Sequence, residues 1–225
     1  MEEILMDFSE IKIPVYIINL KERTDRLKSV LETFHGKEEF ELNIIPAIKK
    51  KRGAEGLWQT IISIVKQVEK SEDEIIIICE DDHVFTKDYD RDLFISELID
   101  AGRQGCQILL GGIGNYRSAV PISQHRLWID WSWCTQFMVL YKPAFSKILN
   151  AKFGEKDVAD EFLSLLLSNK MVLYPFVSVQ KEFGYSDVTE SNNEVGHMDN
   201  LFKKTEERLN LLMNKFNQYC TTNNR

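Results

Sequence analysis

A run of isoleucines that ends in three acids is the feature that most constrains the fold. The segment from Ile75 to Cys79 leads directly into Glu80, Asp81 and Asp82. Consecutive β-branched residues predict a strand buried on both faces, as in a parallel sheet covered by helices. Carboxylates cannot continue unpaired into such a core, because desolvating them is costly or forces them to take up protons. The acids are therefore expected at the carboxyl end of the strand, where open α/β sheets place their ligand crevices.

The three acids also indicate a kind of ligand. Carboxylate oxygens are hard ligands, and several of them crowded at a crevice suit Mg²⁺ or Mn²⁺, commonly shared with a phosphate. A divalent metal is accordingly the expected cofactor. The alternative interpretation is a surface-exposed acid cluster that caps a strand or a helix.

Hydrophobic periodicity surrounds this strand with alternating strands and helices. A strand at 13–20 precedes a helix that begins at Thr24, the expected N-cap, and ends before Gly36. The order strand, helix, strand, loop, helix, strand predicts an α/β fold, with a central mixed, mostly parallel sheet flanked by helices. The other expected elements are strands at 40–45, 107–110, 136–141 and 171–174, helices at 57–68, 89–102, 143–150, 157–167 and 201–219, loops at 49–56 and 179–181, and a flexible turn at 111–114.

Size, charge and cysteine usage narrow the partners. The 225 residues suit a single domain, and a net charge of -7 argues against nucleic acid as the main partner. The chain shows neither a signal-peptide pattern nor an apolar run of about 20 residues that could span a bilayer. Its four scattered cysteines fit reduced thiols. These features predict a cytoplasmic protein; the alternative is attachment at the inner face of the membrane through the amphipathic helix at 201–219.

Two other features leave alternatives open. The basic run from Lys49 to Arg52 is a localisation signal, a phosphate-facing loop or a solvated turn. Trp128, Trp131 and Trp133 alternate along a short stretch. Indoles can stack on sugar faces, but they also fill cores.

Several short segments resemble one family when they are taken in order. These segments are Val15 to Leu27, which contains Ile18-Asn19-Leu20 and Arg23-Thr24-Asp25-Arg26, the glycines within 53–56, Glu80-Asp81-Asp82, Pro175 to Gln180, and Ser186-Asp187-Val188. Together they resemble glycosyltransferase family 25, which includes bacterial lipooligosaccharide glycosyltransferases and collagen galactosyltransferases. The resemblance spans roughly residues 13 to 188, and its specificity lies in the series. One departure follows Gly56, where Leu57 to Ile61 stand in place of the family's Cys-x-x-Ser-His.

The resemblance implies a GT-A-like fold and a hexosyltransferase. It implies transfer of a hexose, galactose favoured, from a nucleotide sugar such as a UDP-hexose, with inversion at the anomeric carbon. The implied acceptor is a glycan or glycolipid, in the biosynthesis of lipopolysaccharide or a related surface glycan. The donor-binding half is expected at about 10–115 and the acceptor-side half at about 116–200, followed by a C-terminal helix at 201–220.

Roles for individual residues follow from the resemblance and the chemistry. Asn19, Leu20, Arg23, Arg26, Glu80 and Asp81 are expected to bind the nucleotide sugar, with Asp82, Glu80 and His197 as metal ligands and Asp187 as a further candidate. For Arg26 the alternative is an ion pair at the helix start. Inversion needs a general base, and Asp160 and Glu161 at the head of an apolar helix are the candidates. Their alternative is that of ordinary acids favoured at a helix N-terminus.

Two rival functions remain at this stage. Ile61, in place of the family histidine, motivates a catalytically weak nucleotide-sugar or glycan-binding protein on the same fold. A Mg²⁺-dependent nucleotidyltransferase or phosphohydrolase would use the same three acids, although the sequence contains no Gly-rich Walker loop.

Overall fold

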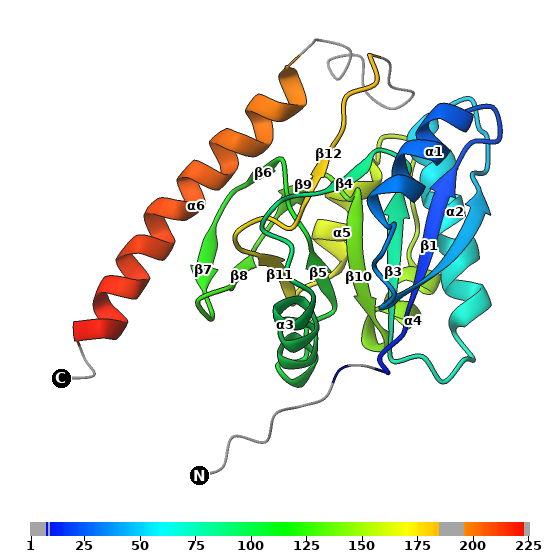
Figure 1. The fold of residues 1–225 in the computed structure, drawn as a ribbon. Coiled ribbons are helices and arrows are strands. Elements are labelled where there is room, and N and C mark those ends of the chain that lie inside the picture. Colours follow the sequence, from blue (N-terminus) through cyan, green and yellow to red (C-terminus); the bar gives the residue numbers. More distant parts are fainter. Residues whose placement is uncertain (1–7, 9, 185–195, 223–225) are drawn as a thin grey trace.

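The computed structural model describes residues 8, 10–184 and 196–222, which form one sheet with helices on both faces (Figure 1). The elements in chain order are β1 (Ile13–Asn19), α1 (Thr24–Thr33), β2 (Phe40–Pro46), α2 (Gly53–Val68), β3 (Ile75–Glu80), β4 (His83–Phe85), α3 (Arg91–Arg103), β5 (Ile108–Leu110), β6 (Asn115–Tyr116), β7 (Ala119–Pro121), β8 (Arg126–Ile129), β9 (Ser132–Trp133), β10 (Phe137–Tyr141), α4 (Lys142–Asn150), α5 (Ala159–Leu166), β11 (Lys170–Leu173), β12 (Ser178–Gln180) and α6 (His197–Thr222).

The main sheet has eight strands in the order β2-β1-β3-β10-β5-β11-β8-β7. Strands β1, β2 and β3 are parallel neighbours, β5 and β11 are another parallel pair, and only β10 and β8 run in the opposite direction. Two small ladders, β4 with β12 and β6 with β9, complete the described strands. The predicted α/β class is confirmed, with a mixed, mostly parallel sheet between two layers of helices.

The isoleucine run is buried on both faces, as its sequence predicts. Ile77 belongs to the apolar cluster under α1 and α3, whereas Ile76 and Ile78 belong to the cluster under α2, α4, α5 and part of α6. Because side chains alternate along a strand, Glu80 points to the same face as Ile76 and Ile78. The first acid of the triplet therefore faces the side of α2 and α5.

Three local predictions are wrong, each for a packing reason. The expected loop at Gly53 to Gly56 is the first turn of α2, and a Cβ on Gly56 would lie 2.3 Å from the carbonyl oxygen of Ile48. Glycine is needed there for close approach of the preceding segment, so it does not break the helix. The N-cap of α1 is Arg23, one residue before Thr24, and it makes no side-chain capping bond.

The third error concerns the segments that were expected to be loose. The region at 179–181 was expected to be a loop, but Ser178–Gln180 is β12 and pairs with β4. The glycines at 111–114 form a tight contact with this strand, since a Cβ on Gly112 would lie 2.0 Å from the carbonyl oxygen of Ser178. A turn packed this closely is not flexible in the expected sense.

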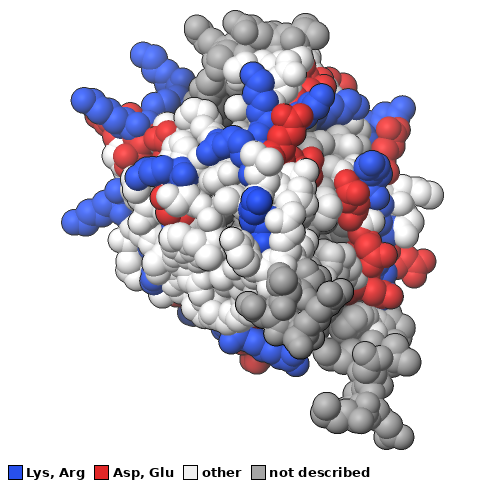
Figure 2. Space-filling view, turned by 90° about the vertical axis from the view of Figure 1, so that its left-hand side faces the viewer, with Lys and Arg blue, Asp and Glu red and all other residues white. Residues whose placement is uncertain are grey.

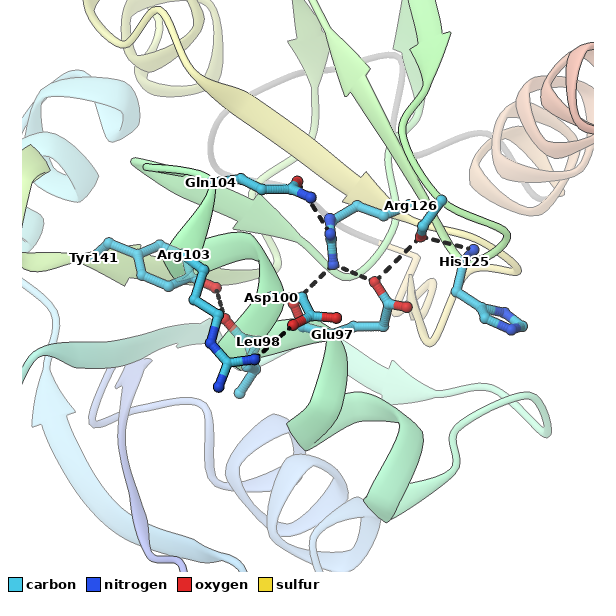
Figure 3. A network of polar contacts seen from close by, with 9 residues as sticks. Glu97, Leu98, Asp100, Arg103, Gln104, His125, Arg126 and Tyr141 are labelled. Carbon is cyan, nitrogen blue, oxygen red and sulfur yellow. Dashed lines mark hydrogen bonds and ion pairs between the residues drawn. The ribbon is translucent and has the colours of Figure 1, made fainter. Parts of the chain in front are cut away.

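A buried polar network fastens α3 to β8 (Figure 3). The Arg126 guanidinium, 1% exposed, forms an ion pair with Glu97 and donates to the Glu97 carbonyl oxygen (2.9 Å) and to Oε1 of Gln104 (3.1 Å). Ser123 also donates to the Glu97 carboxylate (3.4 Å). The network satisfies a charge that the sheet would otherwise bury unpaired.

The C-terminal helix α6 packs along one side of the molecule (Figure 1). Its buried residues Met198, Phe202, Leu209 and Met213 join the core. On the side of the molecule that α6 occupies, Lys and Arg side chains are interspersed with Asp and Glu (Figure 2). Within the described residues, no helix is long and apolar enough to cross a bilayer.

Candidate functional site

The carboxyl ends of β1 and β3 meet at one edge of the sheet and border a cleft. Ile18 is paired in register with Glu80, so the residues that follow both strands are neighbours. The cleft has a volume of about 410 Å³. Its wall includes Leu20 and Arg23 after β1, Glu80 and Asp81 at the end of β3, and the basic residues Lys49, Lys50 and Lys51 after β2. A row of cations therefore lines the same cleft as two of the three acids.

Asp81 is fixed by two groups from the β1–α1 connection. Its Oδ2 accepts from Nδ2 of Asn19 (2.8 Å), and its Oδ1 accepts from Nη1 of Arg26 (3.2 Å). Arg26 is 5% exposed and lies over the ring of Phe183, 4.8 Å from its centre. Asn19 and Arg26 were expected to bind the nucleotide sugar. The structure shows them orienting Asp81, and their contact with a ligand remains a prediction.

Asp82 lies beside Asp81 but points to β12. Its Oδ2 accepts from Nε2 of Gln180 (2.7 Å) and lies 3.5 Å from Nη1 of Arg26. Its buried Oδ1 makes no hydrogen bond with any described residue. Burial raises the pKa of Asp82 to about 6. A buried carboxylate oxygen without a donor is uncommon in folded proteins, and a bound cation would satisfy it.

Glu80 points to the α5 side, as its place in the strand requires. Its Oε1 accepts from the hydroxyl of Thr135 (3.0 Å). Burial and the neighbouring charge of Asp82 raise the pKa of Glu80 to about 8, and the charge of Asp160 contributes in the same direction. The structure therefore brings Asp160, from α5, into electrostatic contact with the acids of β3.

The two candidate bases have different surroundings. Asp160 accepts from the backbone N–H of Cys134 (3.0 Å), and burial raises its pKa. Glu161 accepts from the indole N–H of Trp133 (2.9 Å) in a more exposed position. Asp160 is thus the more buried of the two acids, and its charge contributes to the raised pKa of Glu80.

His197 was expected to be a metal ligand, but its position differs from that of the acids. It is the first residue of α6, and the N–H groups of its neighbours Gly196 and Met198 donate to Glu182 (2.7 Å each). Asp187, the further candidate, lies outside the described residues. In the part of the chain that the structure describes, no three His, Cys, Asp or Glu side chains are grouped to hold a metal.

Glu80 and Asp82 nevertheless fit a metal ion whose remaining ligands are substrate phosphates and water. Mg²⁺ and similar ions are often bound by one or two carboxylates together with substrate phosphates and water. Glu80 at the cleft and the unbonded Oδ1 of Asp82 supply hard oxygen atoms of this kind. The metal roles of these two residues remain a prediction that this donor set supports.

The lysine segment is the part of the site that the sequence left undecided. The N–H of Ile48 donates to Oγ1 of Thr60 (2.9 Å), which in turn donates to the carbonyl oxygen of Gly56 (2.8 Å). These bonds fasten the start of the basic run to α2. Ile61, at the position of the family histidine, is fully buried in the core. The sequence does contain one indication of this role: the basic run is followed directly by Gly53 and Gly56, and glycine permits close packing of the backbone.

The acids predict a distinctive pH dependence for the metal-free protein. The pKa of Glu80, about 8, is raised from an ordinary value of 4.5, so the folded state holds a proton that the unfolded chain releases earlier. The stabilisation of the folded state by this proton is fully present below the pKa that Glu80 has in the unfolded chain. It is lost as the pH rises through the pKa that Glu80 has in the folded protein. Because of Glu80, we expect the Tm measured in thermal melts to decrease as the pH is raised from about 5 to about 8.5.

Metal binding should show the opposite trend, because it requires ionised carboxylates. The rise in Tm caused by Mn²⁺ with UDP should be larger at about pH 8.5 than at about pH 5.5. Glu80→Gln removes the titration and should flatten both trends. A Glu80→Gln profile that parallels the wild type would contradict the assignment.

Comparisons with known proteins establish the fold only. No family model and no curated protein matches the chain. Among solved structures, A197 from STIV matches with a TM-score of 0.50 at 11% identity, covering 79% of this chain and 87% of its own. This likeness shows a shared fold.

Two weaker structural matches are named as enzymes. Apo UDP-glucose pyrophosphorylase matches with a TM-score of 0.47 at 10% identity, over 85% of this chain and 82% of its own. A glycosyltransferase involved in the glycosylation of the major capsid of PBCV-1 matches with a TM-score of 0.37 at 13% identity, over 61% of this chain and 63% of its own. Similarity at this level carries no argument about activity, so the function has to be argued from the site.

Proposed function

We propose that the protein is a nucleotide-sugar-dependent glycosyltransferase that transfers a hexose to a glycan or glycolipid acceptor. The observation that carries this proposal is a single cleft whose wall contains both cations, Arg23 and Lys49–Lys51, and the acids Glu80 and Asp81. The cations suit the phosphates of a nucleoside diphosphate, because charge-assisted hydrogen bonds to phosphate are strong. UDP-galactose as donor, inversion and a role in surface-glycan synthesis rest on the family resemblance.

Each part of the site has a task in this reaction. The lysines and Arg23 hold the diphosphate and stabilise the charge that it gains as the glycosidic bond breaks. Asp160 accepts the proton of the acceptor hydroxyl as that oxygen attacks the anomeric carbon. Its raised pKa, caused by burial, moves it closer to the working pH of a general base. Asn19 and Arg26 keep Asp81 in place at the cleft.

A divalent ion held by Glu80 and Asp82 would, when bound, neutralise the phosphates of the leaving group. The affinity of that ion depends on how Gln180 and Arg26 orient Asp82. Such outer partners commonly change metal affinity about 10- to 100-fold when they are removed.

Hydrolysis of the donor tests the proposed activity. Each of UDP-galactose, UDP-glucose and GDP-mannose is incubated with the protein and Mn²⁺, and release of nucleoside diphosphate is measured. Asp82→Ala should abolish the release, and Asp88→Ala, on an exposed turn, should not. In a second incubation, the protein is given a nucleoside triphosphate and a sugar 1-phosphate in place of the donor. Release of pyrophosphate in that incubation would indicate a nucleotidyltransferase.

Removing the lysine charges should weaken nucleotide binding. The combined substitution Lys49→Gln, Lys50→Gln and Lys51→Gln is expected to raise the Kd for the bound nucleoside diphosphate at least about tenfold, because charged hydrogen bonds contribute about 1.5–3 kcal/mol each. Isothermal titration calorimetry at two salt concentrations measures the change. The wild-type Kd should rise with salt more steeply than that of the variant.

The control replaces two exposed lysines elsewhere on the surface in the same way. Lys203→Gln with Lys204→Gln, on the exposed face of α6, should leave the Kd unchanged. An equal loss of affinity in both variants would mean that net charge, and not the cleft, governs binding.

A further inference from the structure

Three consecutive residues donate hydrogen bonds to three different carboxylates. The indole N–H of Trp133 donates to Glu161 (2.9 Å), the backbone N–H of Cys134 to Asp160 (3.0 Å), and the hydroxyl of Thr135 to Glu80 (3.0 Å). Consecutive Cα atoms are about 3.8 Å apart, so the Cα atoms of residues 133 and 135 are separated by about 7.6 Å at most. The three carboxylates therefore bind to one short segment, from Glu80, which lines the cleft, to Glu161 at Trp133.

The backbone in this segment has an unusual conformation. Cys134 has a φ of 75°, and within the described residues it is the only residue other than glycine with a positive φ. Such conformations persist where the surrounding structure enforces them, and they are often found at functional sites. Here the positive φ of Cys134 occurs where the side chain of Trp133 and the backbone N–H of Cys134 both donate hydrogen bonds to α5.

Trp133 is fixed in place while remaining open to solvent. Its carbonyl oxygen accepts from the N–H of Gly114 (3.0 Å), and it pairs with Asn115 across the β6–β9 ladder. Its side chain is 37% exposed. Trp131 lies edge-to-face against it at 5.2 Å, and Arg117 lies 5.7 Å from the ring centre of Trp131. Trp133 therefore presents part of its indole to solvent beside a second indole.

We propose that Trp133 and Glu161 bind a pyranose ring of the acceptor, with the sugar stacked on the exposed indole and its hydroxyls donating to the carboxylate. This inference rests on the proposed function and gives the acceptor a place in the site. A pyranose has an apolar C–H face and polar hydroxyls at its edge, and an indole beside a carboxylate matches both. The sugar would lie next to Asp160, one residue from Glu161, where its neighbouring hydroxyl can reach the base.

The composition of this surface favours a sugar over a protein or lipid partner. The exposed indole is bordered by an ionisable carboxylate at hydrogen-bonding distance, which a lipid chain or an apolar protein surface would have to desolvate. Through Cys134 and Thr135, this surface is connected by hydrogen bonds to Asp160 and to Glu80, which lines the cleft. A bound sugar can donate its hydroxyls to Glu161 while its apolar face contacts the indole.

The test measures saccharide binding to every variant by isothermal titration calorimetry, and to the proteins that retain Trp133 also by intrinsic tryptophan fluorescence. Methyl β-galactopyranoside, methyl β-glucopyranoside and lactose are titrated into the full chain, with and without UDP and Mn²⁺. At least one saccharide should change the emission, and Trp133→Ala should weaken its binding at least about tenfold, the usual cost of removing a tryptophan anchor. Trp128→Ala is the matched control: Trp128 is also partly exposed, but its indole donates to Ser168 on another part of the sheet, and saccharide affinity should be unchanged.

A second pair of variants guards against misfolding at position 133. Glu161→Gln keeps an acceptor for the indole and should weaken saccharide binding less than Glu161→Ala does. When transfer is assayed, Trp133→Phe should raise the acceptor KM with kcat little changed, since it retains an apolar surface.

The outcomes separate this inference from the proposed function. Calorimetric binding of a saccharide that is lost in Trp133→Ala and kept in Trp128→Ala supports the subsite, even if no nucleotide raises the Tm of the same sample. If nucleotides bind, but no saccharide changes the emission or Trp133→Ala binds it as well as Trp128→Ala does, the subsite is overturned and the donor site stands.

Discussion

Asp160→Asn is expected to lower the rate of hexose transfer by a factor of about 10²–10⁴, the usual contribution of a general base. An amide cannot take the proton of the acceptor hydroxyl, yet it has nearly the same shape as the carboxylate. Asparagine can still accept from the N–H of Cys134 but loses the acceptor for the N–H of Glu161 (2.8 Å), so a thermal melt of the variant serves as the control for its fold. Nucleotide affinity, measured by calorimetry, should remain within about twofold of the wild type, because Asp160 does not line the cleft.

Two further variants decide between the candidate bases. Glu161→Gln should reduce transfer much less than Asp160→Asn, and mainly through the acceptor KM, if Glu161 holds the acceptor. Asp88→Asn, on an exposed turn, is the matched control and should have wild-type kcat. If transfer survives in Asp160→Asn and is lost in Glu161→Gln, the roles of the two acids are reversed.

Arg126→Met is expected to lower the free energy of unfolding by about 3–5 kcal/mol, the range found when one partner of a buried ion pair is removed. The substitution leaves the Glu97 carboxylate in the core without its cation, and the Glu97 carbonyl oxygen and Gln104 lose their donor (Figure 3). A methionine fills part of the volume but offers no hydrogen bond. Urea denaturation followed by circular dichroism measures the loss.

The same region of the fold supplies the control. Arg103 pairs with Asp100 at 3.2 Å, with side chains 65% and 49% exposed, and exposed pairs of this kind contribute about 0–1 kcal/mol. Arg103→Met should therefore be nearly neutral. The double variant Glu97→Met with Arg126→Met should recover much of the stability, because the unpaired charge is gone. A double variant no more stable than Arg126→Met would show that packing, and not the buried charge, dominates the loss.

The parts of the fold that follow from local patterns could be predicted. The run of consecutive β-branched residues in Ile75–Cys79 identified the central strand, which is buried on both faces, and the acids that follow it lie at its carboxyl end. The approach of Asp160 to Glu80 was also within reach, because an acid at a helix start and an acid at a strand end are both driven to the sheet edge.

Contacts between distant segments could not be predicted. The packing of β12 against Gly112 requires a glycine, because a Cβ at that position would lie 2.0 Å from the carbonyl oxygen of Ser178. Hydrophobic periodicity does not indicate such a contact. The basic run reads equally well as a solvated turn until the bond between Ile48 and Thr60 is known. Trp133 looked like core or ligand, and its bond to Glu161 depends on the left-handed backbone at Cys134.

The central claim is that the cleft binds a nucleoside diphosphate together with a divalent metal. Thermal melts of the full chain with UDP, GDP and CMP, each with and without Mn²⁺, test it most directly. The structure predicts that at least one nucleotide raises Tm, and that it does so more strongly with Mn²⁺ than without. If no nucleotide raises Tm under either condition, the glycosyltransferase assignment is contradicted.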